Sequence, residues 1–169
     1  MTTTDPHVHD RPAVPFIGTT TGTTMPTVAE VADRLPELIG ALVGHRITPA
    51  GAPFFQYLDI RDDSMTVRLG VPVPAGAALP EHALPFPAEP GELPAGRYAG
   101  LTHVGPFDGI RGSTERLMAW AAEQGLAFDM STVDGVEHWS ARLEIYLTDP
   151  RVEPDPARFE TDLAIRLAD

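Results

Sequence analysis

The 169-residue sequence contains no cysteine, and this absence removes several kinds of chemistry. Neither a disulfide framework nor a thiol nucleophile nor a thiolate metal site can form without it. Basic residues are also scarce, because 12 Lys and Arg stand against 24 Asp and Glu and the formal net charge is −12. A chain of this charge with no local basic cluster is repelled by polyanions, so we expect no direct binding to nucleic acid or to an anionic membrane.

Long apolar runs are missing as well. The N-terminal stretch MTTTDPHVHDRPAVP has no basic start followed by an apolar core, and no run approaches membrane-spanning length. We therefore expect a soluble cytoplasmic protein. With 43% hydrophobic residues, the chain is long enough to bury the core of one globular domain.

Motifs for phosphates, nucleophiles and metals are not found either. The stretch GTTTGTT lacks the lysine of a phosphate-binding loop, and no Gly-x-Ser-x-Gly nucleophile elbow occurs. The histidines do not have the spacing of metal ligands on a helix or a strand pair. They are His7, His9, His45, His82, His103 and His138. We expect neither a metal nor a cofactor.

Proline and glycine, by contrast, are plentiful and divide the chain. The stretch PAGAALPEHALPFPAEPG, residues 74–91, holds five prolines, which exclude a regular helix or a central strand, so we interpret it as a linker. It separates residues 12–73 from residues 92–169. Residues 1–11 are polar and are expected to form a flexible tail. Residues 12–169 are predicted to form one domain made of two modules.

The two modules resemble each other. FIGTTTGTTMPTVAEVADRL (Phe16–Leu35) aligns without a gap with YAGLTHVGPFDGIRGSTERL (Tyr98–Leu117), at a constant offset of 82 residues. Further along, FFQYLDIRDDSMTVRLGVPV (Phe54–Val73) resembles LEIYLTDP…TDLAIRL (Leu143–Leu167). Each half has the pattern strand, helix, strand, strand. The sequence therefore predicts a duplicated β-α-β-β chain.

Local signals place the two helices. The first is expected to begin at a capping-box pair, Thr27 and Glu30, and to be kinked by Pro36. The second follows the turn at Gly105 and ends at Gly125.

Several strings, read in order, carry a resemblance to a known family. They include LPAGRYAGLTHVGPF, LMAWAAEQG and RLEIYLTDP, and the most specific piece is E-x-Y-x-x-D-P. Their order over Val14–Leu167 resembles the gyrase-inhibitor-like (GyrI-like) small-molecule-binding domain, which is also the effector-binding part of bacterial multidrug-responsive transcription regulators. The resemblance implies an α+β fold of two β-α-β-β modules with pseudo-twofold symmetry. It also implies an antiparallel sheet with helices on one side and a ligand groove on the other.

The string RLEIYLTDP contains the main candidate residue, Glu144. Side chains alternate along a strand, so Leu143 and Ile145 share one face while Glu144 and Tyr146 share the other. Read alone, this is a half-buried strand whose polar face lies in water. If helices cover the apolar face, Glu144 and Tyr146 instead point into the groove. The first module then contributes the matching residues Phe55 and Tyr57.

Other aromatic residues are weaker candidates for the groove. Strict alternation places Trp139 on the face opposite Glu144, so an irregularity near Ser140 is needed to bring Trp139 into the site. Phe107, which follows a Gly-Pro turn, is a candidate for the mouth of the groove. Trp120 is better explained by helix packing, because its spacing matches the buried helix stripe.

Two functions from different classes fit these residues. A carboxylate beside aromatic rings attracts organic cations by charge and by ring quadrupoles. The resemblance links the central glutamate to lipophilic, often cationic drugs, which favours a stand-alone module that binds hydrophobic or polyaromatic small molecules. No helix-turn-helix is expected, because the stretch ahead of Val14 is too short. The alternative, implied by some members of the family, is a hydrolase of electrophilic cyclopropane-type antibiotics with Glu144 as general base or charge stabiliser.

Overall fold

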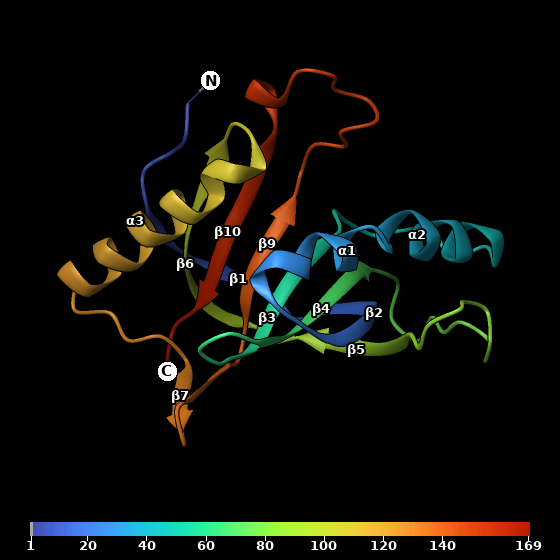
Figure 1. The fold of residues 1–169 in the computed structure, drawn as a ribbon, viewed down its shortest axis with the longest axis horizontal. Coiled ribbons are helices and arrows are strands. Elements are labelled where there is room, and N and C mark those ends of the chain that lie inside the picture. Colours follow the sequence, from blue (N-terminus) through green and yellow to red (C-terminus); the bar gives the residue numbers. More distant parts are fainter. Residues whose placement is uncertain (1) are drawn as a thin grey trace.

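One antiparallel sheet runs through the whole chain in the computed structural model, which describes residues 2–169 (Figure 1). The strand order is β1-β6-β10-β9-β3-β4-β2-β5, and the hairpin of β7 and β8 pairs with β3. The strands are β1 (His7–Arg11), β2 (Val14–Thr23), β3 (Phe54–Ile60), β4 (Met65–Pro72), β5 (Glu89–Leu93), β6 (Gly96–Val104), β7 (Met130–Val133), β8 (Val136–Trp139), β9 (Arg142–Tyr146) and β10 (Glu160–Arg166). The helices are α1 (Val28–Ala32), α2 (Leu35–Gly44) and α3 (Ile110–Glu123). The α+β class predicted from the sequence is confirmed.

The sheet is built from two equivalent sets of elements. Strands β3 and β9 meet in its centre, where Phe55 lies opposite Glu144. Outward from this pair, each half continues with its last strand, β4 or β10, and then its first strand, β2 or β6. The order is therefore the same on both sides, as a pseudo-twofold axis through the central pair requires. The offset of the sequence repeat relates the starts of the first strands, Val14 and Gly96.

In each half, the leading strand, the one that comes first in the chain, pairs with the other half. Strand β1 precedes β2 in the chain but pairs with β6, and β5 precedes β6 but pairs with β2. Residues 7–11, predicted as part of a flexible tail, thus form an edge strand. The period-two signal is weak there because none of the five residues of this edge strand is buried. The end of the proline-rich segment likewise enters β5 at Glu89.

The first helix differs from its prediction in two details. Pro36 lies in the first turn of a new helix, α2, so the expected kink is a break between α1 and α2. A proline is tolerated there because the N–H of the first turn has no helical partner. The expected capping bond between Thr27 and Glu30 is not formed, and the Thr27 hydroxyl lies 2.8 Å from that of Thr24 instead.

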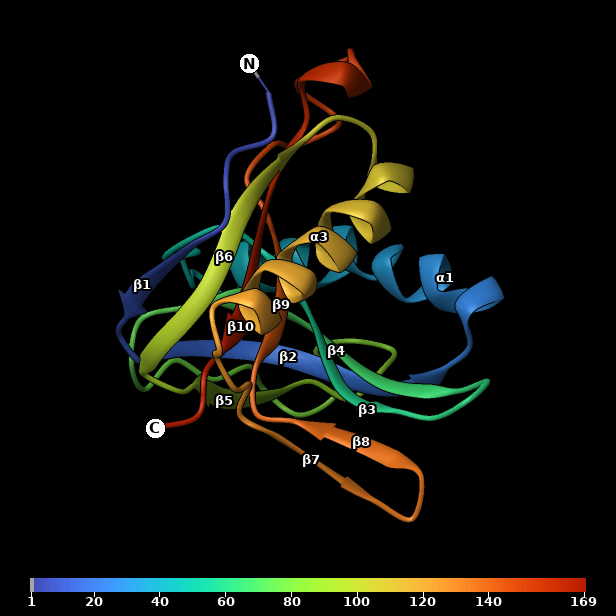
Figure 2. The same cartoon turned by 90° about the vertical axis from the view of Figure 1, so that its left-hand side faces the viewer.

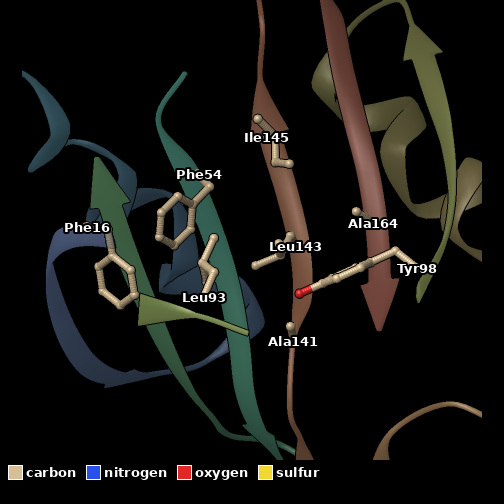
Figure 3. Close-up of a cluster of buried hydrophobic side chains, with 8 residues drawn as sticks. All are labelled: Phe16, Phe54, Leu93, Tyr98, Ala141, Leu143, Ile145 and Ala164. Carbon is tan, nitrogen blue, oxygen red and sulfur yellow. The ribbon is translucent and has the colours of Figure 1, made fainter. Parts of the chain in front are cut away.

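The helices all pack on one face of the sheet. Leu117, in the buried stripe of α3, belongs to one apolar cluster with Leu163 of β10, and Leu38 of α2 belongs to another with Ile17 of β2. Figure 2 shows α3 lying along β6 and β10. The other face carries no helix, and the curl of the sheet buries it around a cluster shown in Figure 3. In that cluster the rings of Phe16 and Phe54 meet edge to face, 5.2 Å apart.

Within residues 2–169, no helix is long and apolar enough to cross a membrane.

Candidate functional site

Glu144 lies in the middle of a row of side chains that crosses the sheet. The strand register puts Phe55 of β3 on one side of it and Leu163 of β10 on the other. Leu69 and Leu101 continue the row outward on the next strands. All four of these neighbours are buried. A carboxylate in such a row does not lie on a solvated strand face, and the polar-face alternative considered for the sequence does not apply.

The row lies on the face of the sheet that carries the helices, which corrects the predicted position of the groove. Thr114 of α3 lines the same cavity as Glu144, and Leu163 packs in one cluster with Leu117 of α3. Alternation along β9 holds, since Leu143 joins the cluster on the helix-free face. Alternation alone could not tell which face the helices cover, because apolar side chains bury both faces of this strand.

Two tyrosines hold the carboxylate. Tyr57 Oη donates to Glu144 Oε1 at 2.9 Å, and Tyr146 Oη donates to Glu144 Oε2 at 3.1 Å. Tyr57 lies two residues after Phe55, and Tyr146 lies two residues after Glu144, so the pseudo-twofold axis relates the two tyrosines. The two halves therefore offer the same donor, but only the second half has a carboxylate at the centre.

Burial controls the protonation of this group. Loss of solvent raises the pKa of Glu144, while the two tyrosine hydrogen bonds and the charge of Arg142 oppose that shift. Burial, and then the neighbouring carboxylate, also raise the pKa of Tyr57 and of Tyr146. Both phenols consequently keep their protons and remain donors to Glu144 near neutral pH.

Arg142, which the sequence analysis did not single out, completes the cluster. Its guanidinium carbon lies 5.2 Å from the centre of the Tyr57 ring and 4.8 Å from that of Trp139. The available signal was its position two residues before Glu144 on the same strand. Burial lowers the pKa of Arg142, but a guanidinium stays charged in proteins.

The structure contains the irregularity that Trp139 required. The chain bends at Ser140, whose N–H donates to Asp129 O at 3.0 Å. Trp139 and Arg142 are three positions apart, so strict alternation would place them on opposite faces of the strand. Because of the bend they lie on the same face. Trp139 contacts the guanidinium of Arg142, which lines the cavity beside Glu144. Its indole N–H donates to Glu137 Oε1 at 3.3 Å.

The remaining predicted aromatic residues lie around the tyrosines. The centre of the Phe55 ring is 5.2 Å from the centre of the Tyr57 ring, and the centre of the Phe107 ring is 5.7 Å from that of the Tyr146 ring. Phe107 is 45% exposed, so it lies at the outer edge of the cluster. His103, which the sequence did not indicate, is buried nearby with its Nδ1 2.8 Å from Ser113 Oγ, and its charge would favour ionised Glu144.

The cavity beside Glu144 is nearly closed, at about 10 Å³. It is lined by Tyr57, Thr114, Arg142, Leu143, Glu144, Leu163 and Ile165. This is room for about one water, whereas a drug-sized ligand needs about 300–1,000 Å³. A larger open hollow of about 340 Å³ lies elsewhere, where Trp120 and Arg116 of α3 face the N-terminal segment. Among the residues described, no three His, Asp or Glu side chains are grouped to hold a metal ion.

Solved structures share this fold at low sequence identity. The EcmrR C-terminal domain matches with 16% identity and a TM-score of 0.74, covering 98% of both chains. SAV2435 bound to tetraphenylphosphonium matches with 8% identity and a TM-score of 0.66, over 98% of this chain and 94% of that one. A hydrolase from Listeria innocua matches with 15% identity and a TM-score of 0.63, over 96% and 91% of the two chains.

The lengths of the matched proteins differ. In a DNA complex of EcmrR, this chain spans only 57% of the EcmrR chain, with 17% identity and a TM-score of 0.73. The comparison with curated proteins gives no match. The profile of the GyrI-like small molecule binding domain matches residues 4–168, which is nearly the whole chain. Taken with the duplicated modules and the strand order, this match shows that the chain belongs to the GyrI-like small-molecule-binding domain family.

Proposed function

We propose that this protein binds hydrophobic small molecules, lipophilic cations among them, at the site around Glu144. The observation that carries the proposal is a carboxylate set among buried apolar neighbours and held by two tyrosine hydroxyls. A solved structure of the same fold, SAV2435, is bound to tetraphenylphosphonium, which is a lipophilic cation. At 8% identity that likeness supports the fold, and the ligand class is carried by the site itself.

The chemistry of recognition follows from the surroundings of the carboxylate. In a partly desolvated site, attraction between Glu144 and a cation is stronger than in water. Aromatic faces add about 0.5–2 kcal/mol for each ring that contacts the cation. The tyrosine hydrogen bonds already fix the carboxylate, so little side-chain entropy is lost when a ligand binds. Flat apolar parts of a ligand would stack on Phe107, whose exposed ring lies beside Tyr146, while the buried Phe55 ring supports Tyr57.

The test is a calorimetric titration with tetraphenylphosphonium. Glu144→Gln keeps the shape of the side chain and removes its charge, and a charge-assisted contact is worth about 1–3 kcal/mol, so affinity should fall about 5- to 150-fold. Glu92→Gln is the matched control, because Glu92 is an exposed residue of β5 at the far edge of the sheet. An equal loss in both variants, or no binding by the wild type, would contradict the proposal.

A second candidate, hydrolysis of an electrophilic small molecule, is favoured by one observation. Burial raises the pKa of Glu144 toward the range in which a general base works near neutral pH. In this mechanism a water oxygen bonds to the electrophilic carbon while Glu144 accepts the proton that the water releases. The carboxyl then protonates the group that leaves that carbon, which restores the carboxylate.

Turnover separates the two candidates. A cyclopropane-containing electrophile is incubated with the protein at a hundred equivalents, and the hydrolysed product is measured. A hydrolase forms many equivalents of product, and Glu144→Gln should slow it by about 10²–10⁴. A binding protein forms none above the uncatalysed rate.

A further inference from the structure

The site around Glu144 already contains an organic cation, and it belongs to the protein. The guanidinium of Arg142 lies over the rings of Tyr57 and Trp139, at 5.2 and 4.8 Å. It faces the same cavity as Glu144, whose carboxylate it influences electrostatically. Rings above a planar cation with a carboxylate beside it are the arrangement proposed above for a lipophilic cationic ligand.

Arg142 is held differently from Arg68 and Arg166, two other arginines of the sheet. Arg68 also stacks on a ring, that of Phe16, but its Nη1 donates to Gln56 Oε1 at 3.2 Å. Arg166 donates from Nη1 to Asp129 Oδ2 at 2.7 Å. Within residues 2–169, no side chain or carbonyl accepts a hydrogen bond from the Arg142 guanidinium, and no carboxylate oxygen lies within 4.0 Å of its nitrogens. The two rings and the charges of Glu137 and Glu144 hold it, so no hydrogen bond to the protein has to break when it moves.

The other polar side chains that line the cavity are anchored. Tyr57 and Glu144 bond to each other, and the hydroxyl of Thr114 donates to the carbonyl of Ile110 at 3.0 Å. The leucine and isoleucine side chains of the lining belong to the buried core. Because the cavity is only about 10 Å³, any ligand larger than a water must displace part of its wall. Arg142 is the long side chain that is free to leave.

We propose that Arg142 occupies the cation subsite of the ligand-free protein and that a ligand binds by displacing it from Tyr57 and Trp139. This inference rests on the proposed function. It makes Arg142 an internal competitor, so the site discriminates against cations that bind the rings less well than a guanidinium does. Glu137, which accepts from the Trp139 indole, offers a carboxylate to the displaced side chain.

Affinity measurements with two probes test the competition. Tetraphenylphosphonium is the cation, and triphenylphosphine oxide is a neutral probe with similar rings. If the Arg142 guanidinium occupies the cation subsite in about nine of ten molecules, its removal in Arg142→Met should tighten binding of the cation by about tenfold. Arg142→Lys, which keeps the charge without the planar stack, should lie between that variant and the wild type. The neutral probe should gain less than the cation, because it does not replace the charge beside Glu144.

The control removes a positive charge elsewhere. Arg11 lies over the Tyr98 ring at 5.8 Å on the edge strand β1, so Arg11→Met changes the net charge equally and should leave affinity unchanged within about twofold. If the wild type binds the cation and Arg142→Met binds it equally or more weakly, the displacement model is wrong while the proposed function stands. If neither protein binds either probe, both proposals fail.

A second readout does not depend on a variant. In the free protein, the side-chain N–H and methylene signals of Arg142 should be shifted upfield by the two rings, as seen by NMR of the full chain. Saturation with tetraphenylphosphonium should remove this shift. An Arg142 signal that keeps its ring-current shift in the saturated protein would overturn the displacement model.

Discussion

At the scale of single residues, the central feature is one carboxylate that accepts from two tyrosines, one in each half of the chain. Tyr57 and Tyr146 occupy equivalent positions, but their partners differ, since Phe55 and Glu144 face each other at the centre. The repeat therefore provides two equivalent tyrosine donors. Only one of the two central positions is a carboxylate, so both donate to Glu144.

Removing a single donor should weaken the site without unfolding it. Tyr57→Phe and Tyr146→Phe each delete a hydrogen bond worth about 0.5–1.5 kcal/mol, so affinity for tetraphenylphosphonium should fall about 2- to 13-fold. Each change also removes a bond that favours the ionised form, so the pKa of Glu144, followed by carboxyl carbon NMR, should rise further. A Glu144 pKa that falls in both variants would contradict this account.

The unfolding free energy of the protein should depend on pH through the carboxyl group of Glu144. Because burial raises the pKa of Glu144 in the folded state, the folded protein binds this proton more tightly than the unfolded chain does. The contribution is complete below the unfolded pKa of about 4.3 and is lost as the pH rises through the folded pKa. The unfolding free energy of the wild type minus that of Glu144→Gln, from urea titrations, should thus fall over this window. A difference that rises with pH would show that the hydrogen bonds outweigh burial.

The sequence predicted much of this cluster and missed part of it for a physical reason. Strand parity, the match of Tyr57 to Tyr146 across the repeat and the E-x-Y-x-x-D-P resemblance together predicted that Glu144, Tyr146 and Tyr57 lie near one another, and none of the three suffices alone. Arg142 has the same parity, yet a charged residue at the start of a strand looks like ordinary surface. The face of the sheet on which the helices pack depends on the handedness of distant connections, and the pattern along one strand does not encode it.

At the scale of elements, a glycine leaves room for an aromatic ring on the helix-free face. A Cβ at Gly70 would collide with the ring of Phe54, whereas a Cβ at Gly22 of the neighbouring strand β2 would meet nothing. Gly70→Ala should destabilise the protein by about 1–3 kcal/mol through overpacking, as measured from the denaturant midpoint. Gly22→Ala is the control and should be neutral or slightly stabilising. Equal effects of the two changes would show that the ring of Phe54 moves aside freely.

The edge strand β1 allows a second test at this scale. Deleting residues 2–11 removes the backbone pairing of His7–Arg11 with β6 and the hydrogen bond from the Thr4 N–H to Thr102 O. We expect a lower melting temperature, at about 2–4 °C for each kcal/mol lost in a chain of this size. Tetraphenylphosphonium should still bind to the folded fraction, because β1 lies at the edge of the sheet and Glu144 at its centre. An unchanged melting temperature would mean that these residues behave as the flexible tail that their composition suggested.

At the scale of the whole molecule, the β-α-β-β order of each half could be inferred from the repeat, but the leading strands β1 and β5 and their exchange between the halves could not. The repeat aligns Val14 with Gly96 and so defines two modules, each with a complete strand set. Nothing in the sequence of His7–Arg11 indicates whether its partner is β2, which follows directly, or β6. The pairing is decided by which sheet edge is open, and that is a property of the assembled molecule.

The exchange of leading strands has a consequence for synthesis on the ribosome. His7 pairs with Gly100, so β1 has no partner until about 90 further residues have been made. At about 5–20 residues per second, that wait is on the order of 10 s. During it, β1 would be an unpaired strand beside a growing nascent chain, which is a setting that favours aggregation of apolar segments. Its sequence, HVHDR, is polar and charged at all positions but one, a composition suited to staying hydrated until β6 arrives.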